Sequence, residues 1–301
     1  MCFVFALILL EQWSRRQARY HHSRHGELPR YILRGKHAVA AFLACLMPLL
    51  LGFLLPAGQL FVWAVQTGAE MLDGEFFRLA FNSVMLAMVT AILATMLALL
   101  MAYGKRLRAT FFIRSAVRWV GMGYAIPGTV IAVGVMIPFG WLDNSLDAWL
   151  RLHFNFSSGL LLSGSLFVLI FAYLVRFLAV SLQTVDAGLL KIKPSLEEAA
   201  RCLGSSPTGV LARIHIPMLR GSLLTAILLV FVDVMKELPA TLILRPFNFN
   251  TLAVRAFELA SDERLADSAS AALVIVGVGI IPVILLSFAI SRSRKRYVQT
   301  T

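Results

Sequence analysis

Six long apolar blocks constrain the fold of this chain more than any other feature of its sequence. A helix needs about 20 consecutive apolar residues to cross roughly 30 Å of hydrocarbon. Blocks of that length run over residues 38–65, 82–103, 116–137, 160–182, 223–244 and 269–290. Of the 301 residues 59% are hydrophobic and only 15% are charged, an excess that a soluble globular chain does not carry. The sequence therefore predicts an all-α, polytopic membrane protein with six transmembrane helices.

Basic residues occupy every second loop between these blocks. Clusters of Lys and Arg lie at residues 15–36, 105–114, 191–220 and 292–296, whereas the alternate loops carry mainly Asp and Glu. Because cytoplasmic loops retain Lys and Arg, the basic loops and both ends of the six-helix domain are predicted to be cytoplasmic. This pattern explains the net charge of +12, and no nucleic-acid motif accompanies it.

The first eleven residues do not fit a secretory signal. Residues 3–10 are apolar but too short to span a membrane, and their positive charges follow them instead of preceding them. We interpret residues 1–11 as the tail of a preceding transmembrane helix and residues 12–37 as a basic cytoplasmic linker. A short interfacial segment is the alternative interpretation. Residues 38–291 then form the six-helix transmembrane domain, and residues 292–301 a cytoplasmic tail.

The basic loop before the fifth block predicts two short helices joined by a turn. Ser195 and Glu198 have the spacing of a capping box at the start of the first helix. Gly204 suits the end of that helix, and Pro207 suits the first turn of the second. Pro217 is expected to interrupt the chain before the fifth span. The loop is therefore predicted to lie on the inner membrane surface as a cytoplasmic helix–turn–helix.

Seven residues of this loop resemble the EAA loop of the permeases of ATP-binding-cassette (ABC) importers. They are Glu198, Ala199, Ala200, Gly204, Ile214, Ile216 and Pro217. The family pattern ends in Ile-x-Leu-Pro, so Ile216 departs from it conservatively. The resemblance implies a type I importer permease whose loop docks on a cytoplasmic ATPase subunit. This chain has no Gly-rich phosphate loop followed by Lys-Ser/Thr, so ATP–Mg is expected on that separate subunit, no cofactor on this chain and no enzyme activity of its own.

Other segments resemble the ferric-iron importer permeases, which fuse two six-helix halves in one chain. These segments read YAIPGT at 124–129, KELPAT at 236–241, LRPF at 244–247 and TLAVR at 251–255. The resemblance covers essentially the whole chain as a second half, and it implies a multi-pass protein of the bacterial cytoplasmic (inner) membrane. Permeases for phosphonates, thiamine and polyamines share much of it and remain alternatives. A second homologous half, two ATPase subunits, an extracytoplasmic substrate-binding protein and membrane lipid are the implied partners.

Charged residues within the fifth block have two interpretations. Asp233 and Lys236 are three residues apart, on one helix face near the middle of the predicted span, with Glu237 beside them. Arg176 in the fourth block is a candidate partner for either acid, and Pro239 frees a backbone carbonyl nearby. These residues are either a local structural ion pair or the lining or gate of a translocation path. In an ion-coupled secondary transporter, the rival from another class, the same charges would form the coupling relay.

Two further features bear on the pathway and on metal binding. Pro127 and Gly128 suggest a kink in the third span, either as a gate hinge or for packing alone. His21, His22 and His25 are not interpreted as a metal site, because hard ferric iron prefers oxygen ligands and this cluster falls in the basic linker. No metal site is therefore predicted.

Overall fold

The computed structural model describes residues 33–157 and 159–298 of the chain. The predicted tail of a preceding helix, most of the basic linker, its three histidines and the last three residues lie outside the described residues. Helices make up most of the described chain, and no strand occurs in it. The predicted all-α class is therefore confirmed.

The chain divides into two compact units. The first covers residues 1–62 and the second residues 63–301. The described part of the first unit contains α2 (Lys36–Leu49), a π-helical turn η1 (Leu50–Leu54) and the beginning of α3 (Leu55–Met71). The second unit contains the end of α3 and all the later elements, which include the candidate site.

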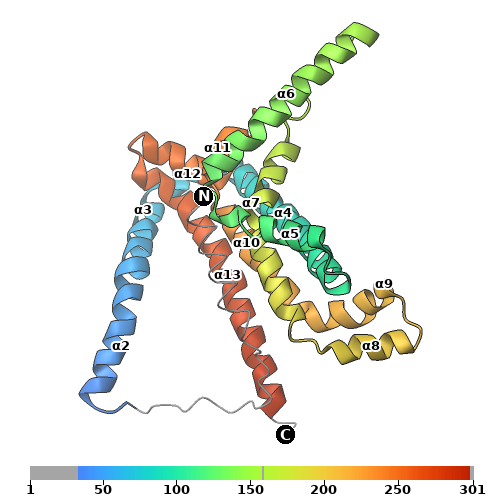
Figure 1. Cartoon of the computed structure of the whole chain (residues 1–301). Coiled ribbons are helices and arrows are strands. Elements are labelled where there is room, and N and C mark those ends of the chain that lie inside the picture. The colour runs from blue at the N-terminus through green and yellow to red at the C-terminus, as the bar shows by residue number, and fades with distance from the viewer. Residues whose placement is uncertain (1–32, 158, 299–301) are drawn as a thin grey trace. The chain divides into compact units, whose positions relative to one another are not determined.

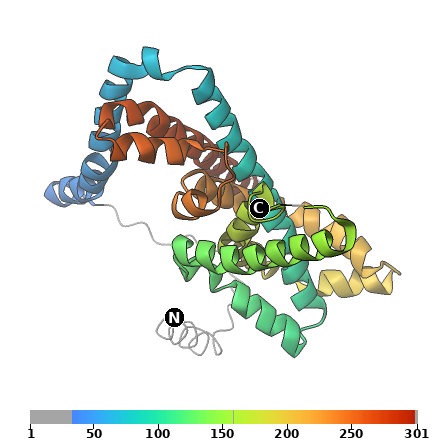
Figure 2. The same ribbon diagram turned by 90° about the horizontal axis from the view of Figure 1, so that it is seen from above.

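The second unit is built entirely from helices in its described part (Figure 1). In chain order they are α4 (Gly74–Leu107), α5 (Phe111–Val120), the 3-10 turn η2 (Gly123–Ala125), α6 (Gly128–Phe154), α7 (Leu166–Leu189), α8 (Pro194–Cys202), α9 (Pro207–Val210), the π-helical turn η3 (Leu211–His215), α10 (Ile216–Met235), α11 (Pro239–Leu244), α12 (Leu252–Ser261) and α13 (Leu265–Val298). Both views show the hairpin of α8 and α9, in yellow, at the edge of the bundle and beyond the end of α7 (Figures 1 and 2).

Six helices of the described chain are long and apolar enough to cross a membrane. They run over Lys36–Gly68, Gly74–Leu107, Gly128–Phe154, Leu166–Leu189, Pro207–Met235 and Leu265–Ile284. Their number and order agree with the six apolar blocks of the sequence. The chain is a multi-pass α-helical membrane protein.

The third span does not lie where the apolar block at 116–137 placed it. Helix α5 ends at Val120, and the span itself is α6, which begins at Gly128. Between them the backbone passes so close to α7 that a Cβ on Gly123 would collide with the carbonyl oxygen of Val175. Pro127 is the N-cap of α6 and is not inside a helix. The predicted kink at Pro127–Gly128 is therefore wrong, because these residues begin the span.

The fifth span is also displaced from its predicted position at 223–244. Helix α10 ends at Met235, and Pro239 opens the separate helix α11. A proline cannot donate a hydrogen bond to the carbonyl four residues earlier, which here belongs to Met235. Asp233 and Lys236 consequently lie at the C-terminal end of α10 and not in the middle of a helix.

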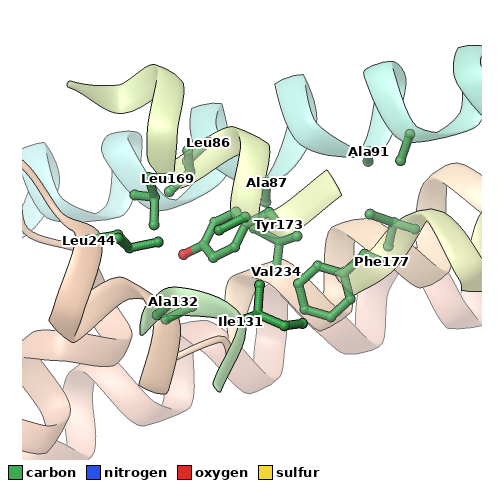
Figure 3. Close-up of a cluster of buried hydrophobic side chains, with 14 of the residues drawn as sticks. Leu86, Ala87, Ala91, Ile131, Ala132, Leu169, Tyr173, Phe177, Val234 and Leu244 are labelled. Atoms are coloured by element: carbon green, nitrogen blue, oxygen red, sulfur yellow. The ribbon is translucent and has the colours of Figure 1, made fainter. Parts of the chain in front are cut away.

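The core of the second unit is formed where α4, α7 and α10 pack against one another. A row of alanines spaced three or four residues apart along α4 is almost completely buried, and these are Ala87, Ala91, Ala94, Ala98 and Ala102. Such small side chains let helices approach closely, as is common in membrane proteins. Tyr173 and Phe177 of α7 fill the space between Val234 of α10 and Ile131 of α6 (Figure 3). This packing fixes the ends of α4, α7 and α10, from which the candidate site is built.

Candidate functional site

The first arm of the cytoplasmic loop is α8, and it begins differently from the prediction. Lys193 is its N-cap, Pro194 takes the first helical position, and no side chain caps the helix. The predicted capping box of Ser195 and Glu198 is therefore wrong. A proline at the first position needs no donor there, so it can start the helix one residue earlier than the serine would.

The turn between the arms agrees with the prediction for Gly204. Its φ of +83° lies in the left-handed region that favours glycine. The Gly204 amide donates to the Arg201 carbonyl at 2.9 Å, and the Ser205 amide donates to the Ala200 carbonyl at 3.0 Å. This pair of bonds is a Schellman ending, which satisfies carbonyls at the end of α8.

The second arm is continuous with the fifth span. The Ser206 hydroxyl accepts a hydrogen bond from the Gly209 amide at 3.2 Å and caps α9, with Pro207 in the first turn. The helix then passes through η3 into α10 without a break. The predicted interruption at Pro217 is wrong, because the π-helical turn just before it accommodates the missing donor. A displacement of this arm is therefore applied directly to a membrane-spanning helix.

The seven residues that match the EAA pattern do not all face the same way. Five of them are exposed on the hairpin and the start of α10, namely Glu198, Ala199, Gly204, Ile216 and Pro217. Ala200 is buried and Ile214 is half-buried, so both serve the packing of the hairpin on the bundle. Leu203, which the motif does not include, is 86% exposed at the turn. Leu203 thus presents an apolar side chain to the surroundings at the tip of the hairpin.

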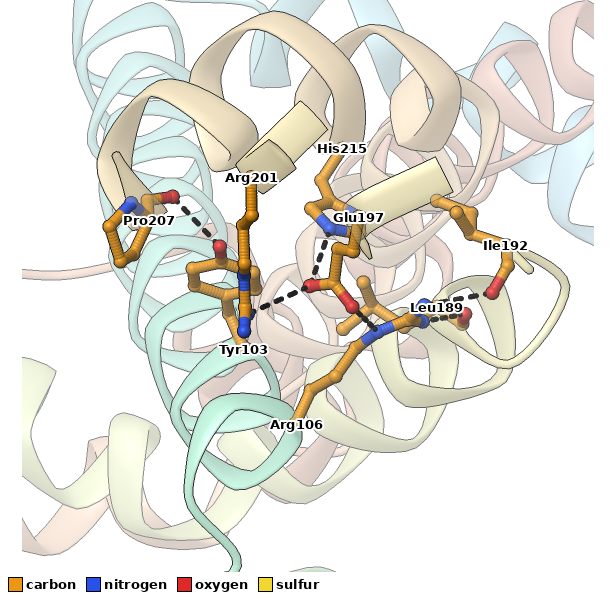
Figure 4. Close-up of polar contacts among 8 residues, drawn as sticks. All are labelled: Tyr103, Arg106, Leu189, Ile192, Glu197, Arg201, Pro207 and His215. Atoms are coloured by element: carbon orange, nitrogen blue, oxygen red, sulfur yellow. Dashed lines mark hydrogen bonds and ion pairs between the residues drawn. The ribbon is translucent and has the colours of Figure 1, made fainter. Parts of the chain in front are cut away.

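Glu197, one residue before the matched Glu198, is buried and joins three segments of the chain (Figure 4). Its Oε2 accepts a hydrogen bond from Arg106 Nε of α4 at 3.0 Å. Its Oε1 lies 3.1 Å from Nε2 of His215, the last residue of η3, and 4.0 Å from Arg201. Glu197 was not among the residues predicted for the site. The one sequence feature that could have indicated its burial is its position three residues before Ala200, because residues three apart lie on the same face of a helix.

The charges around Glu197 keep its carboxylate ionised. Burial by itself raises the pKa of the Glu197 carboxyl, but the hydrogen bonds from Arg106 and His215 lower it below the ordinary value. An ionised carboxylate only accepts hydrogen bonds, so His215 must donate through Nε2. One carboxylate oxygen thus accepts a hydrogen bond from α4, and the other accepts one from η3.

Arg106 connects the same point to the end of α7. Its guanidinium donates to the carbonyl oxygens of Leu189 at 2.5 Å and of Ile192 at 2.8 Å. These carbonyls lie at the C-terminal end of α7 and just beyond it, and the Leu189 carbonyl also accepts from the Ile192 amide at 3.1 Å. One turn earlier on α4, the Tyr103 hydroxyl donates to the carbonyl of Pro207 at 2.8 Å. The end of α4 therefore contacts α7, α8 and α9 through hydrogen bonds.

The charged residues at the end of α10 form two ion pairs. Lys236 Nζ lies 2.9 Å from Asp233 Oδ1, within one turn and with the lysine largely exposed. Arg176 Nη1 of α7 lies 2.8 Å from Glu237 Oε1. Of the two partners considered for Arg176, the structure pairs it with Glu237. Glu237 also accepts from the Ala240 amide at 3.3 Å, in the first turn of α11, which Pro239 opens.

The start of α6 lies against the Arg176–Glu237 pair. A Cβ on Gly128 would collide with the Arg176 guanidinium and would lie 2.6 Å from Glu237 Oε1. The structure thus brings Arg176, Glu237 and Gly128 together where α6, α7 and α11 meet. Within the described chain, no group of three or more His, Cys, Asp or Glu side chains could hold a metal ion.

Comparison with known proteins relates the chain to transport permeases. No protein-family model matches it. The Fe(3+)-transport system permease protein FbpB 2 of Haemophilus influenzae is 26% identical over 294 residues, which cover 95% of this chain and 54% of that protein. The putative 2-aminoethylphosphonate transport system permease protein PhnV of Salmonella typhimurium is 27% identical over 183 residues, covering 60% of this chain and 62% of that protein. The chain thus spans little more than half the length of these curated relatives.

A solved structure shares the fold. It belongs to a bacterial ABC transporter for the import of alginate, and it superposes with a TM-score of 0.63 over 86% of this chain and 95% of that chain, at 16% identity. These likenesses relate the chain in sequence to transport-system permeases, one of them for ferric iron, and in fold to a chain of an ABC importer. Both curated relatives are named as permease proteins of transport systems.

Proposed function

We propose that this chain forms half of the membrane-spanning permease of an ABC importer in the bacterial cytoplasmic (inner) membrane. The observation that carries the proposal is the hairpin of α8 and α9, whose turn exposes Leu203 and Gly204 and whose second arm continues into the fifth span. A separate ATPase subunit would bind ATP–Mg and receive this hairpin, and this chain would bind no cofactor.

The geometry supports a mechanical role for the hairpin. Closure of the ATPase subunits would displace the hairpin, and the displacement would reach α10 through the continuous second arm and α7 through the short link at residues 190–193. Packing of α4 against both helices would carry the motion into the core. The basic loops support a cytoplasmic position for the hairpin and for both ends of the six-helix domain at 38–291.

Ferric iron is the substrate that we propose first. The ferric-iron relative matches nearly the whole chain, whereas the phosphonate relative matches 60% of it. An extracytoplasmic binding protein would select the substrate, and a second homologous half would complete the pathway. The Arg176–Glu237 pair, with Gly128 against it, is the proposed gate, because it joins three helices at a break in the fifth span. Phosphonate is the alternative substrate.

Site-specific photo-crosslinking tests the docking role. A photoreactive residue at Leu203 should capture an ABC ATPase in the native membrane, identified by mass spectrometry of the product. Leu160 is the matched control, because it is an exposed leucine in the loop before α7, at the opposite end of that helix from α8. Capture of the same ATPase from both positions, or from neither, would contradict the proposal.

A further inference from the structure

The root of the hairpin contains a buried ion pair that joins two different helices, α4 and α8. Arg106 and Glu197 have side-chain exposures of 17% and 9%. A second pair, Lys105–Asp186, joins α4 to α7 at 2.9 Å, but its side chains are 36% and 32% exposed. The two pairs start from adjacent residues of α4 and differ mainly in burial and in the number of segments they connect.

We propose that Arg106 and Glu197 form a positioning clamp that makes the hairpin and the end of α4 move as one body. The inference rests on the proposed function, since it names how displacement of the docked hairpin reaches a helix to which the hairpin is not directly connected in sequence. The Arg106 guanidinium donates to Glu197, to Leu189 and to Ile192, so one side chain ties α4 to the end of α7 and to α8. The planar fork of arginine suits three such acceptors, and a lysine could not reach them in the same way.

His215 extends the clamp to the root of the fifth span. It is fully buried, and its Nε2 meets the Glu197 oxygen that Arg106 does not use. A single carboxylate therefore connects α4 with both arms of the hairpin. Buried groups with fixed partners restrict relative motion more than exposed pairs do, because water cannot replace a lost partner.

A purely structural role would give a different result from a clamp. If the pair only helps the hairpin to fold, removing it would abolish docking. If the pair transmits motion, the hairpin would still dock but would move without α4. The double substitution Arg106→Met/Glu197→Met separates the two roles, because it leaves neither charge unpaired in a buried site. Lys105→Met/Asp186→Met is the matched control from the adjacent residue of α4.

Pulsed electron paramagnetic resonance can measure the motion directly. One spin label is placed on Cys202 of α8 and one on Phe77→Cys near the other end of α4, after Cys2 and Cys45 are replaced by serine. The permease is measured with its ATPase subunits, without nucleotide and after trapping with ATP and vanadate. In the wild type and in the Lys105→Met/Asp186→Met control, the distance between the labels should not change on trapping. In Arg106→Met/Glu197→Met it should shift by about 2 Å, the upper end of typical helix displacements in such transitions.

The possible outcomes separate the clamp from the proposed function. An unchanged distance in Arg106→Met/Glu197→Met, with the ATPase still bound, would overturn the clamp, as would loss of ATPase binding by that variant alone. Arg106→Lys keeps the positive charge but removes the planar guanidinium, so the distance between the labels should also change on trapping in this variant. An unchanged distance in Arg106→Lys would contradict the role of the guanidinium. Failure of the wild type itself to bind an ABC ATPase would overturn the proposed function, and the inference would fall with it.

Discussion

Replacing Arg106 by methionine should weaken the attachment of the hairpin to the bundle far more than replacing the adjacent Lys105 by methionine. The substitution leaves the buried Glu197 carboxylate with His215 and the distant Arg201 as partners, and it removes the donors to Leu189 and Ile192. Removing one member of a buried pair typically costs about 3–5 kcal/mol. Because Arg106 is 17% exposed, the lower end of that range, about 3 kcal/mol, is appropriate.

The adjacent Lys105→Met should cost much less. Its pair with Asp186 is about one-third exposed, and exposed pairs contribute about 0.2–1 kcal/mol. The difference between the two variants, about 2–3 kcal/mol, corresponds to a factor of roughly 30 to 150 in a local opening equilibrium. Adding Glu197→Met to Arg106→Met should restore part of the loss, since no charge is then stranded.

Hydrogen–deuterium exchange of the purified protein measures this difference. Peptides from residues 194–215 should exchange about a hundredfold faster in Arg106→Met than in the wild type, while α12, remote from the hairpin, should be unaffected. Lys105→Met should change the same peptides only slightly. Equal protection of the hairpin in the two variants would refute the assignment of Arg106 and Glu197 as its principal attachment.

Three further predictions concern the hairpin and its orientation. Gly204→Asp, which forces a side chain onto the positive φ of the turn, should uncouple substrate uptake from ATP hydrolysis without preventing membrane insertion; normal uptake with the ATPase bound would remove the turn from the mechanism. In a cysteine-free background, an impermeant thiol reagent should label Asp73→Cys but not Arg201→Cys from outside intact cells, and the reverse result would invert the topology. Because the pKa of Glu197 is lowered, its contribution to hairpin stability should be complete above the ordinary value of 4.5 and should be lost as pH falls through the lowered pKa. Hydrogen-exchange protection of the hairpin amides, corrected for the intrinsic exchange rate at each pH, measures this loss. Constant protection down to pH 2 would contradict the prediction.

The six spans and the hairpin turn could be predicted from sequence because local rules determine them. Apolar length is enough to predict the number of membrane helices, and a glycine such as Gly204 is favoured wherever a helix ends in a left-handed residue. The Ser206–Pro207 start of the second arm follows from capping preferences in the same way. None of these features depends on a distant part of the chain.

The misplaced spans had tertiary causes. The apolar run at 116–137 is interrupted because the backbone at Gly123 packs against α7. Hydropathy alone cannot predict such a close contact between two backbones. At Pro217 a π-helical turn accommodates the proline, whereas at Pro239 the helix ends and restarts. The two prolines look alike in sequence, so only the surrounding packing distinguishes them.

Glu197 was missed because its role depends on a partner far away in the sequence. Beside Glu198 it looks like one of two equivalent surface acids at the start of a helix. Arg106, which binds it, lies 91 residues earlier and was interpreted only as a cytoplasmic orientation signal. The partner of Arg176 was likewise open between Asp233 and Glu237 until the structure paired it with Glu237.

The central claim, that ATP hydrolysis on a separate subunit drives transport through this chain, is tested most directly by uptake into proteoliposomes. The permease, its ATPase subunits and its binding protein are reconstituted, with ATP enclosed and radioactive Fe(III) or 2-aminoethylphosphonate supplied outside as the probe. Uptake should require enclosed ATP and should continue when a protonophore is added. Uptake that stops with the protonophore and is the same with or without ATP would contradict it and would indicate an ion-coupled carrier.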